Sequence, residues 1–123
     1  MGNISIEDLK WNKMMDLWVD EKLESPYSEL IEYSNGIEGE GHFCHFDNVG
    51  GNKDLKEYVD TLMTILPNPL KDNVKRAYEA YIVNPDDISD EDNDTLDSCD
   101  DVYYENESLV NEILVKRASE IEV

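Results

Sequence analysis

Apolar residues recur every three or four positions along much of the chain, which is the period of an α-helix with one buried side. A first helix is predicted over residues 5–22, where Ser5 and Asp8 form a start that resembles a capping box. No run of alternating apolar and polar residues is long enough to predict a strand. The residues of this helix expected to face inward are Leu9, Met14, Leu17 and Trp18, with Trp11 beside them.

A capping residue followed by proline marks two further helix starts, because proline fits the first helical turn. Ser25-Pro26 opens a second helix that is predicted to end at Asn35-Gly36, and Asn68-Pro69 opens a fourth helix that runs to about residue 83. Between them, Asn52 is the expected cap of a third helix over 53–66, which Pro67 stops. The inward residues expected from the third and fourth helices are Leu55, Val59, Leu62, Met63, Leu66, Leu70, Val74, Ala77, Tyr78, Tyr81 and Ile82.

Two stretches are expected to be irregular. Residues 37–51 are rich in glycine and are predicted to form a structured loop with one short helical turn at 42–47. Residues 86–105 are dominated by aspartate and glutamate and are predicted to form an acidic loop before a last helix over 106–120. The sequence therefore predicts one compact all-α domain over residues 1–123, with about five helices.

Acidity is the outlying property of the composition, because 30 acids stand against 10 bases for a formal net charge of -20. Such a chain repels nucleic acid and anionic lipid, so we expect neither direct nucleic-acid binding nor membrane binding. A basic protein surface is the favoured partner, and no lysine or arginine lies between Arg76 and Lys116 to compensate the acids there. The predicted partner-binding residues are Asp86, Asp87, Asp90, Glu91, Asp92, Asp94, Asp97, Asp100, Asp101 and Glu105.

Neither catalysis nor export is predicted. The sequence has no nucleophile elbow, phosphate loop or zinc-protease motif, so no catalytic residue and no cofactor are assigned. No stretch approaches the ~20 apolar residues of a membrane span, and the opening MGNISIEDLKW lacks a basic segment followed by an apolar one. With Cys44 and Cys99 as its only cysteines, the chain is expected to be cytoplasmic, with reduced thiols.

A calcium loop is the first of two metal-site hypotheses. Asp90, Asp92 and Asp94 have the spacing of the first three ligands of an EF-hand loop, and Asp101 falls at the twelfth position. Thr95, however, stands where that loop needs glycine, and the twelfth residue is usually glutamate. We expect only weak, nonspecific binding of divalent cations by this run.

The second hypothesis concerns His42, Cys44 and His45, which are ligand types for soft metals. A structural zinc site needs four ligands, whereas the only other cysteine is far along the chain and there is no third histidine. Phe43 and Phe46 alternate with these residues, which favours packing. His42 is therefore expected to be a hydrogen-bonded structural residue, and no metal site is assigned.

The segment EYSNGIEGEGHFCHFDNVGG resembles the signature of a bacterial family of unknown function that includes an acidic DNA-mimic protein. The family pattern of an Asn-Gly-Gly step, an aromatic pair, asparagine and glycine has counterparts here, although residues 37–40 are inserted into the glycine step. Downstream, LDSCDDVYYENESLVNEILVKRA resembles the closing pattern of the family, an acidic turn, two tyrosines and a final helix. The motif residues, expected to be structural, are Asn35, Gly36, Gly41, His42, Phe43, Phe46, Asn48, Tyr103 and Tyr104.

The resemblance implies an all-helical fold, with a homodimer left open, and a surface that imitates the phosphates of duplex DNA. The leading hypothesis is thus a non-catalytic DNA mimic that occupies the basic surface of a DNA-binding protein. The alternative is an immunity-type or generic interaction protein that neutralises a basic enzyme or toxin through the same electrostatics. A metal-binding protein is the third and weakest hypothesis.

Overall fold

The computed structural model describes residues 5–122. This part of the chain contains five helices, joined by turns and loops, and no strand. This result confirms the predicted all-α fold. The helices are α1 (Ile6–Val19), α2 (Tyr27–Gly50), α3 (Leu55–Met63), α4 (Leu70–Ile82) and α5 (Asp90–Ser119). None of these helices is long and apolar enough to cross a lipid bilayer.

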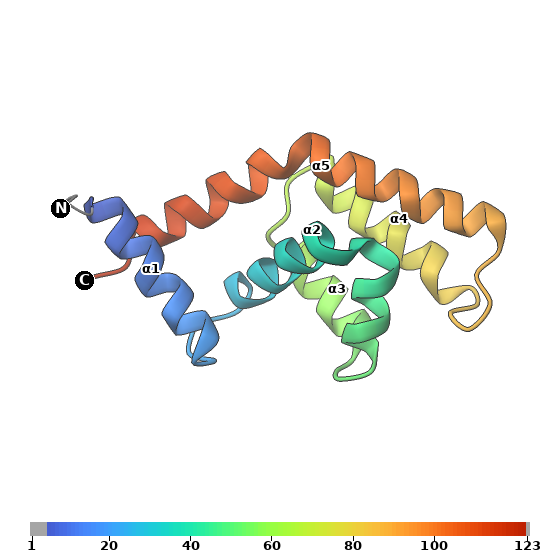
Figure 1. Ribbon diagram of the computed structural model, residues 1–123, viewed down its shortest axis with the longest axis horizontal. Helices are drawn as coiled ribbons and strands as arrows, with labels where there is room; N and C mark the ends of the chain where they lie inside the picture. Colours follow the sequence, from blue (N-terminus) through green and yellow to red (C-terminus); the bar gives the residue numbers. More distant parts are fainter. Residues whose placement is uncertain (1–4, 123) are drawn as a thin grey trace.

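Helix α5 organises the molecule, because it packs against α1, α2 and α4. Its 30 residues correspond to about 45 Å of helix. Figure 1 shows that α4 lies along the first half of α5, whereas α1 lies at the far end, where α5 finishes. Helices α2 and α3 pack against each other and against α4 below α5.

The buried side chains form one cluster, and all five helices contribute to it. Tyr33, Phe46 and Tyr103 are its largest fully buried members, and Met14 is the only buried residue of α1. Two predicted core positions are wrong, because Leu9 is 42% exposed and Ile82 is 47% exposed. Both lie at the edge of their helix's apolar side, where the spacing alone does not decide burial.

Three helices begin at a side-chain cap that satisfies an otherwise free backbone N–H. Ser5 accepts from the N–H of Asp8 at 3.1 Å, as the predicted start of α1 requires, although this helix ends at Val19 and not near residue 22. The predicted cap of α3 is wrong by two residues. Asp54, not Asn52, accepts the N–H of Glu57 at 3.1 Å.

The predicted loop over residues 37–51 is wrong, because α2 continues through Asn35-Gly36 to Gly50. The helix is interrupted only at Gly41, whose φ of 79° and ψ of 174° turn the chain sharply before a second helical half. Glycine is needed there because a side chain rarely adopts a positive φ. The kink brings the second half of α2 back against the first.

The predicted acidic loop over 86–105 is also wrong beyond its first residues, because α5 begins at Asp90 and continues to Ser119. Ser89 caps the helix by accepting the N–H of Asp92 at 3.1 Å. The acids of the first turn are favourable there because they face the positive end of the helix dipole. The residues buried along its inner side, at helical spacing, are Leu96, Cys99, Tyr103, Val110, Leu114 and Ala118.

Candidate functional site

The outer side of α5 carries one carboxylate on each successive turn. We call the set Asp90, Asp94, Asp97, Asp101 and Glu105 the acidic row. Its members are three or four residues apart, which places them on one side of the helix, and all five are exposed. The only bases of α5 are Lys116 and Arg117 in its last turn, so the acidic row has no cation on its own helix.

The acidic row spans about 22 Å, or about one carboxylate per 5.5 Å of helix axis. One strand of duplex DNA carries about one phosphate per 3.4 Å. The row is therefore sparser than a DNA strand, and further exposed acids lie at its start. These are Asp86 and Asp87 in the loop before α5 and Glu91 in its first turn.

Two of the ten predicted partner-binding residues lie outside this exposed set. Asp100 turns inward, where its carboxylate binds His42 of α2, and Asp92 is half-buried on the same helix. The reason is the helical structure itself, because residues spread around all sides of a helix cannot share one surface. Asp100 and Asp92 therefore lie outside the acidic row, whereas the other predicted partner-binding residues are exposed.

A cation does approach the acidic row in space, although the sequence has none between 77 and 115. Arg76 of α4 donates a hydrogen bond from Nη2 to Ser98 Oγ at 3.4 Å, in a groove that Glu91 and Asp94 also line. Other ion pairs among the described residues lie away from the row and join Lys53 to Glu32, Lys56 to Asp60, and Arg117 to Glu24.

Behind the acidic row, Asp100 anchors the kink of α2. Its Oδ1 accepts the backbone N–H of His42 at 2.8 Å and the imidazole Nδ1–H at 2.6 Å. On the other side of the ring, Nε2 lies 2.6 Å from the hydroxyl of Tyr33. Since a carboxylate only accepts, Nδ1 carries a proton, and Nε2 forms the hydrogen bond with the Tyr33 hydroxyl on the other side of the ring. His42 is therefore buried and hydrogen-bonded, as expected from the sequence.

The carboxylate, imidazole and hydroxyl follow one another here in the same order as in nucleophile-activating triads. A substrate, however, cannot reach this hydroxyl. Tyr33 and His42 both have 0% of their surface exposed. Burial, and then the neighbouring Tyr103, raises the pKa of Tyr33 well above its ordinary value, so the phenol keeps its proton. The network can therefore hold helices together, and a reactant has no access to it.

Two glycines of the motif are required by this packing. A Cβ on Gly36 would lie 2.0 Å from Nδ1 of His45, so only glycine lets that ring lie against the helix. A Cβ on Gly41 would lie 2.7 Å from Oδ2 of Asp100, in addition to the strain of a positive φ. Sequence reasoning interpreted Gly36 as a helix stop, whereas its function is to make room for His45.

The aromatic members of the motif separate into two groups. Phe46 and Tyr103 are fully buried, and Tyr103 donates to Ser34 Oγ at 2.9 Å. Phe43 and Tyr104 lie at the surface, 36% and 48% exposed. Burial raises the pKa of Tyr103 to about 12.

The two asparagines of the motif, Asn35 and Asn48, are exposed on α2. Neither belongs to the buried network of Asp100, His42 and Tyr33. The structure thus brings together Gly36, Gly41, His42, Phe46 and Tyr103, and leaves the other motif residues outside.

Sequence reasoning missed three polar residues that support the same region. Tyr58 of α3 binds Nε2 of His45 at 2.8 Å, and Asn73 of α4 donates from Nδ2 to the carbonyl of Cys99 at 2.8 Å. Asp47 accepts from the hydroxyl of Tyr81 at 3.0 Å. No motif marks these residues, because each partner is distant in sequence and meets its residue only in the fold.

The EF-hand hypothesis is wrong, because residues 90–101 are helical and do not form a loop around an ion. Asp92 points away from the side that Asp90 and Asp94 share, so the three carboxylates do not converge on one ion. Within residues 5–122, no three histidine, cysteine, aspartate or glutamate side chains gather as metal ligands. Of the three residues weighed as soft-metal ligands, Cys44 is exposed while His42 and His45 are buried with tyrosine partners.

Comparison with known proteins gives no match, since no family model, no curated protein and no solved structure is significantly similar to the chain. The resemblance to the DNA-mimic family therefore stays a prediction. A functional proposal has to rest on the residues of this chain.

Proposed function

We propose that this chain is a non-catalytic acidic binding protein that acts as a DNA mimic and occupies the basic DNA-binding surface of a partner protein. The observation that supports this most is the acidic row, with a carboxylate on each turn of α5 and no base on that helix before Lys116. Arginine and lysine side chains that contact phosphates also form charge-assisted hydrogen bonds with carboxylates.

The fold supports the proposal by making the row rigid. Helix α5 packs against three other helices, and Asp100 ties its middle to the kink of α2. A rigid charged surface loses little conformational entropy on binding, whereas a flexible acidic loop would have to become ordered. The net charge of -20 adds long-range attraction of a basic partner and speeds association.

A competition experiment tests this function. A panel of purified DNA-binding proteins is loaded with a fluorescent duplex, and release of the duplex is followed while this protein is added. Mimicry predicts that at least one duplex is displaced, with an affinity that falls steeply as salt rises. Displacement that ignores salt, or none across the panel, would count against mimicry. Binding to a basic enzyme or toxin that does not use DNA would favour the alternative function.

A charge-matched pair of variants separates the acidic row from general acidity. Asp94, Asp97 and Asp101 are changed to asparagine in one triple variant. In the control, three exposed acids, Glu7 and Asp16 of α1 and Asp20 directly after it, are changed to the corresponding amides, for the same change of three charges. The row variant should lose much more affinity than the control. Equal losses would show that only total charge matters.

A further inference from the structure

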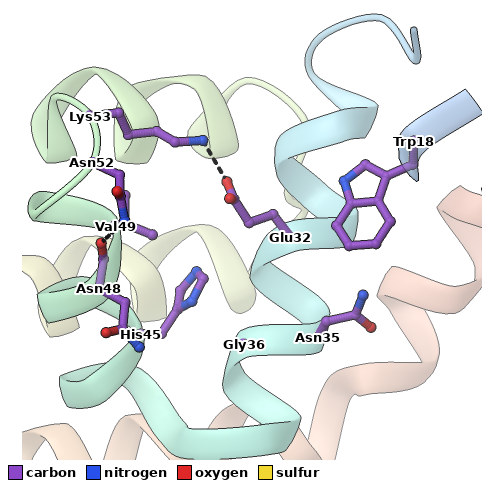
Figure 2. A pocket seen from close by; sticks show the side chains of 9 residues that line it. All are labelled: Trp18, Glu32, Asn35, Gly36, His45, Asn48, Val49, Asn52 and Lys53. Atoms are coloured by element: carbon purple, nitrogen blue, oxygen red, sulfur yellow. Dashed lines mark hydrogen bonds and ion pairs between the residues drawn. The ribbon is translucent and has the colours of Figure 1, made fainter. Parts of the chain in front are cut away.

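A cleft of about 380 Å³ lies on the side of the molecule formed by α1, α2 and the turn before α3. Figure 2 shows the indole of Trp18 on one side of the first half of α2, with His45, Asn48 and Asn52 on the other side. Glu32 and Gly36 lie between these two walls. No residue of α5 lines the cleft, so it is separate from the acidic row.

The polar groups around this cleft are mostly hydrogen-bond acceptors. Asn48 Nδ2 donates to Glu40 at 2.8 Å and Asn52 Nδ2 donates to the carbonyl of Asn48 at 2.9 Å, so both amides keep their Oδ1 atoms for another donor. The side chain of Asn35, also on the cleft wall, has no hydrogen bond to a described residue. Glu32 uses only Oε1 in its ion pair and keeps Oε2.

The cleft already accommodates one cation, that of its own chain. Lys53 Nζ lies 2.8 Å from Oε1 of Glu32 and 5.3 Å from the centre of the Tyr58 ring. Both partners of this ion pair remain accessible, with 45% of the Lys53 side chain and 35% of the Glu32 side chain exposed. Such an exposed pair is weak, so a better-fitting cation can displace the lysine.

We propose that this cleft binds a guanidinium group, stacked on Trp18 and paired with Glu32. A guanidinium is planar, carries five N–H donors and no acceptor, and stacks on aromatic rings. An ammonium group has fewer donors and no planar surface that could stack on the indole. An anion would be repelled by the free oxygens of the cleft and by the net charge of -20. The group can come from a free guanidinium compound or from an arginine of a partner protein.

The test uses the full-length chain and amide NMR, with the indole N–H of Trp18 as the reporter and that of Trp11 as the internal control. The probe is N-acetyl-arginine-methylamide, compared with the corresponding lysine and citrulline amides. We expect a saturable shift at Trp18 with the arginine probe, binding about fivefold weaker with the lysine probe, and no saturation with the neutral citrulline probe. Equal affinity for the arginine and lysine probes, or shifts spread over all acids without saturation, would overturn the proposal.

Two variants at exposed positions keep the test independent of folding. Glu32→Gln should weaken the arginine probe about fivefold, whereas Lys53→Gln should strengthen it because the competing cation is gone. Glu57→Gln, a charge change on the exposed side of α3, is the matched control and should leave the affinity unchanged. Weaker binding by Lys53→Gln would show that Lys53 helps to hold the probe and does not compete with it, and would refute the assignment.

The source of the group is decided by a second comparison. A site for a free compound should bind L-arginine more tightly than arginine within a capped Gly-Arg-Gly peptide. A site for a protein side chain should show the reverse order. Both comparisons are read at Trp18, and neither depends on displacement of DNA, so this proposal can fail while the proposed function stands.

Discussion

Asp100 and His42 are joined by two hydrogen bonds to a single oxygen, one from the backbone N–H and one from the imidazole. The backbone bond makes Asp100 the cap of the second half of α2, although the two residues are 58 positions apart. The same carboxylate fixes the orientation of the ring, whose far nitrogen meets Tyr33. One side chain of α5 thus defines the kink of α2 and the position of the acidic row relative to it.

Replacing Asp100 with alanine should destabilise the fold by about 3 kcal/mol, because His42 loses its charged acceptor in a buried setting. The measurement is the free energy of unfolding from a urea titration followed by circular dichroism. Asp101→Ala changes the next residue, which is exposed, and should change stability by less than about 0.5 kcal/mol. Similar effects of the two variants would mean that Asp100 acts only through its charge.

The two glycines of the first half of α2 should respond in opposite ways to alanine. Gly36→Ala places a Cβ against the His45 ring and should destabilise the fold by about 1–3 kcal/mol. Gly39→Ala meets nothing within 4 Å and should stabilise the helix by about 0.5–1 kcal/mol. Thermal unfolding of both variants checks this, and a stabilising Gly36→Ala would contradict the close packing of His45.

Gly36 shows why the sequence predicted about five helices but misplaced several of their ends. The signals that worked are local: Ser5 caps α1, and the apolar spacing of α3 and α4 places their buried sides. Gly36 failed as a signal because His45, the residue it packs against, lies in the second half of α2 and reaches it only through the kink at Gly41. The same glycine type marks a stop in many helices and close packing in this one.

The candidate site was predictable to a similar degree. Charge counting found the residues of the acidic row, but it could not separate Asp97 and Asp101 from Asp100, which faces His42. The helical period places Asp100 on a different side from Asp97 and Asp101. This placement can be predicted only if residues 90–105 are known to be helical. Leu96, Cys99 and Tyr103 carried this information as an apolar stripe within the acidic segment.

Glu38 should be a source of instability at neutral pH. Partial burial, and then a hydrogen bond and repulsion from Glu107, raises the pKa of the Glu38 carboxyl above its ordinary value of 4.5. The fold therefore binds this proton more tightly than the unfolded chain, and the cost of its ionisation is present at pH 7 and disappears as pH falls towards 4.5. Glu38→Gln should raise the melting temperature at pH 7 and have little effect at pH 4. An equal rise at both values would contradict the shift.

His45 should act in the opposite direction and lower stability in mild acid. Burial is the main cause that lowers its pKa below the ordinary 6.5, and the charges of Glu32 and Glu40 only partly offset it. Near pH 6, His45 therefore binds a proton more readily in the unfolded chain than in the folded one. As a result, the free energy of unfolding falls as pH drops below about 6.5. Protonation of the many carboxylates changes stability too, and a variant is needed to isolate the histidine.

His45→Gln supplies that comparison, because glutamine does not titrate. The variant should be less stable than the parent chain at pH 7.5, since it loses the bond to Tyr58, and its deficit should shrink between pH 7 and pH 5. Urea titrations at each pH give the two curves, and an NMR titration of the His45 ring gives its pKa directly. A deficit that stays constant over this range, or a ring that titrates at or above 6.5, would show that burial does not control the proton at this position.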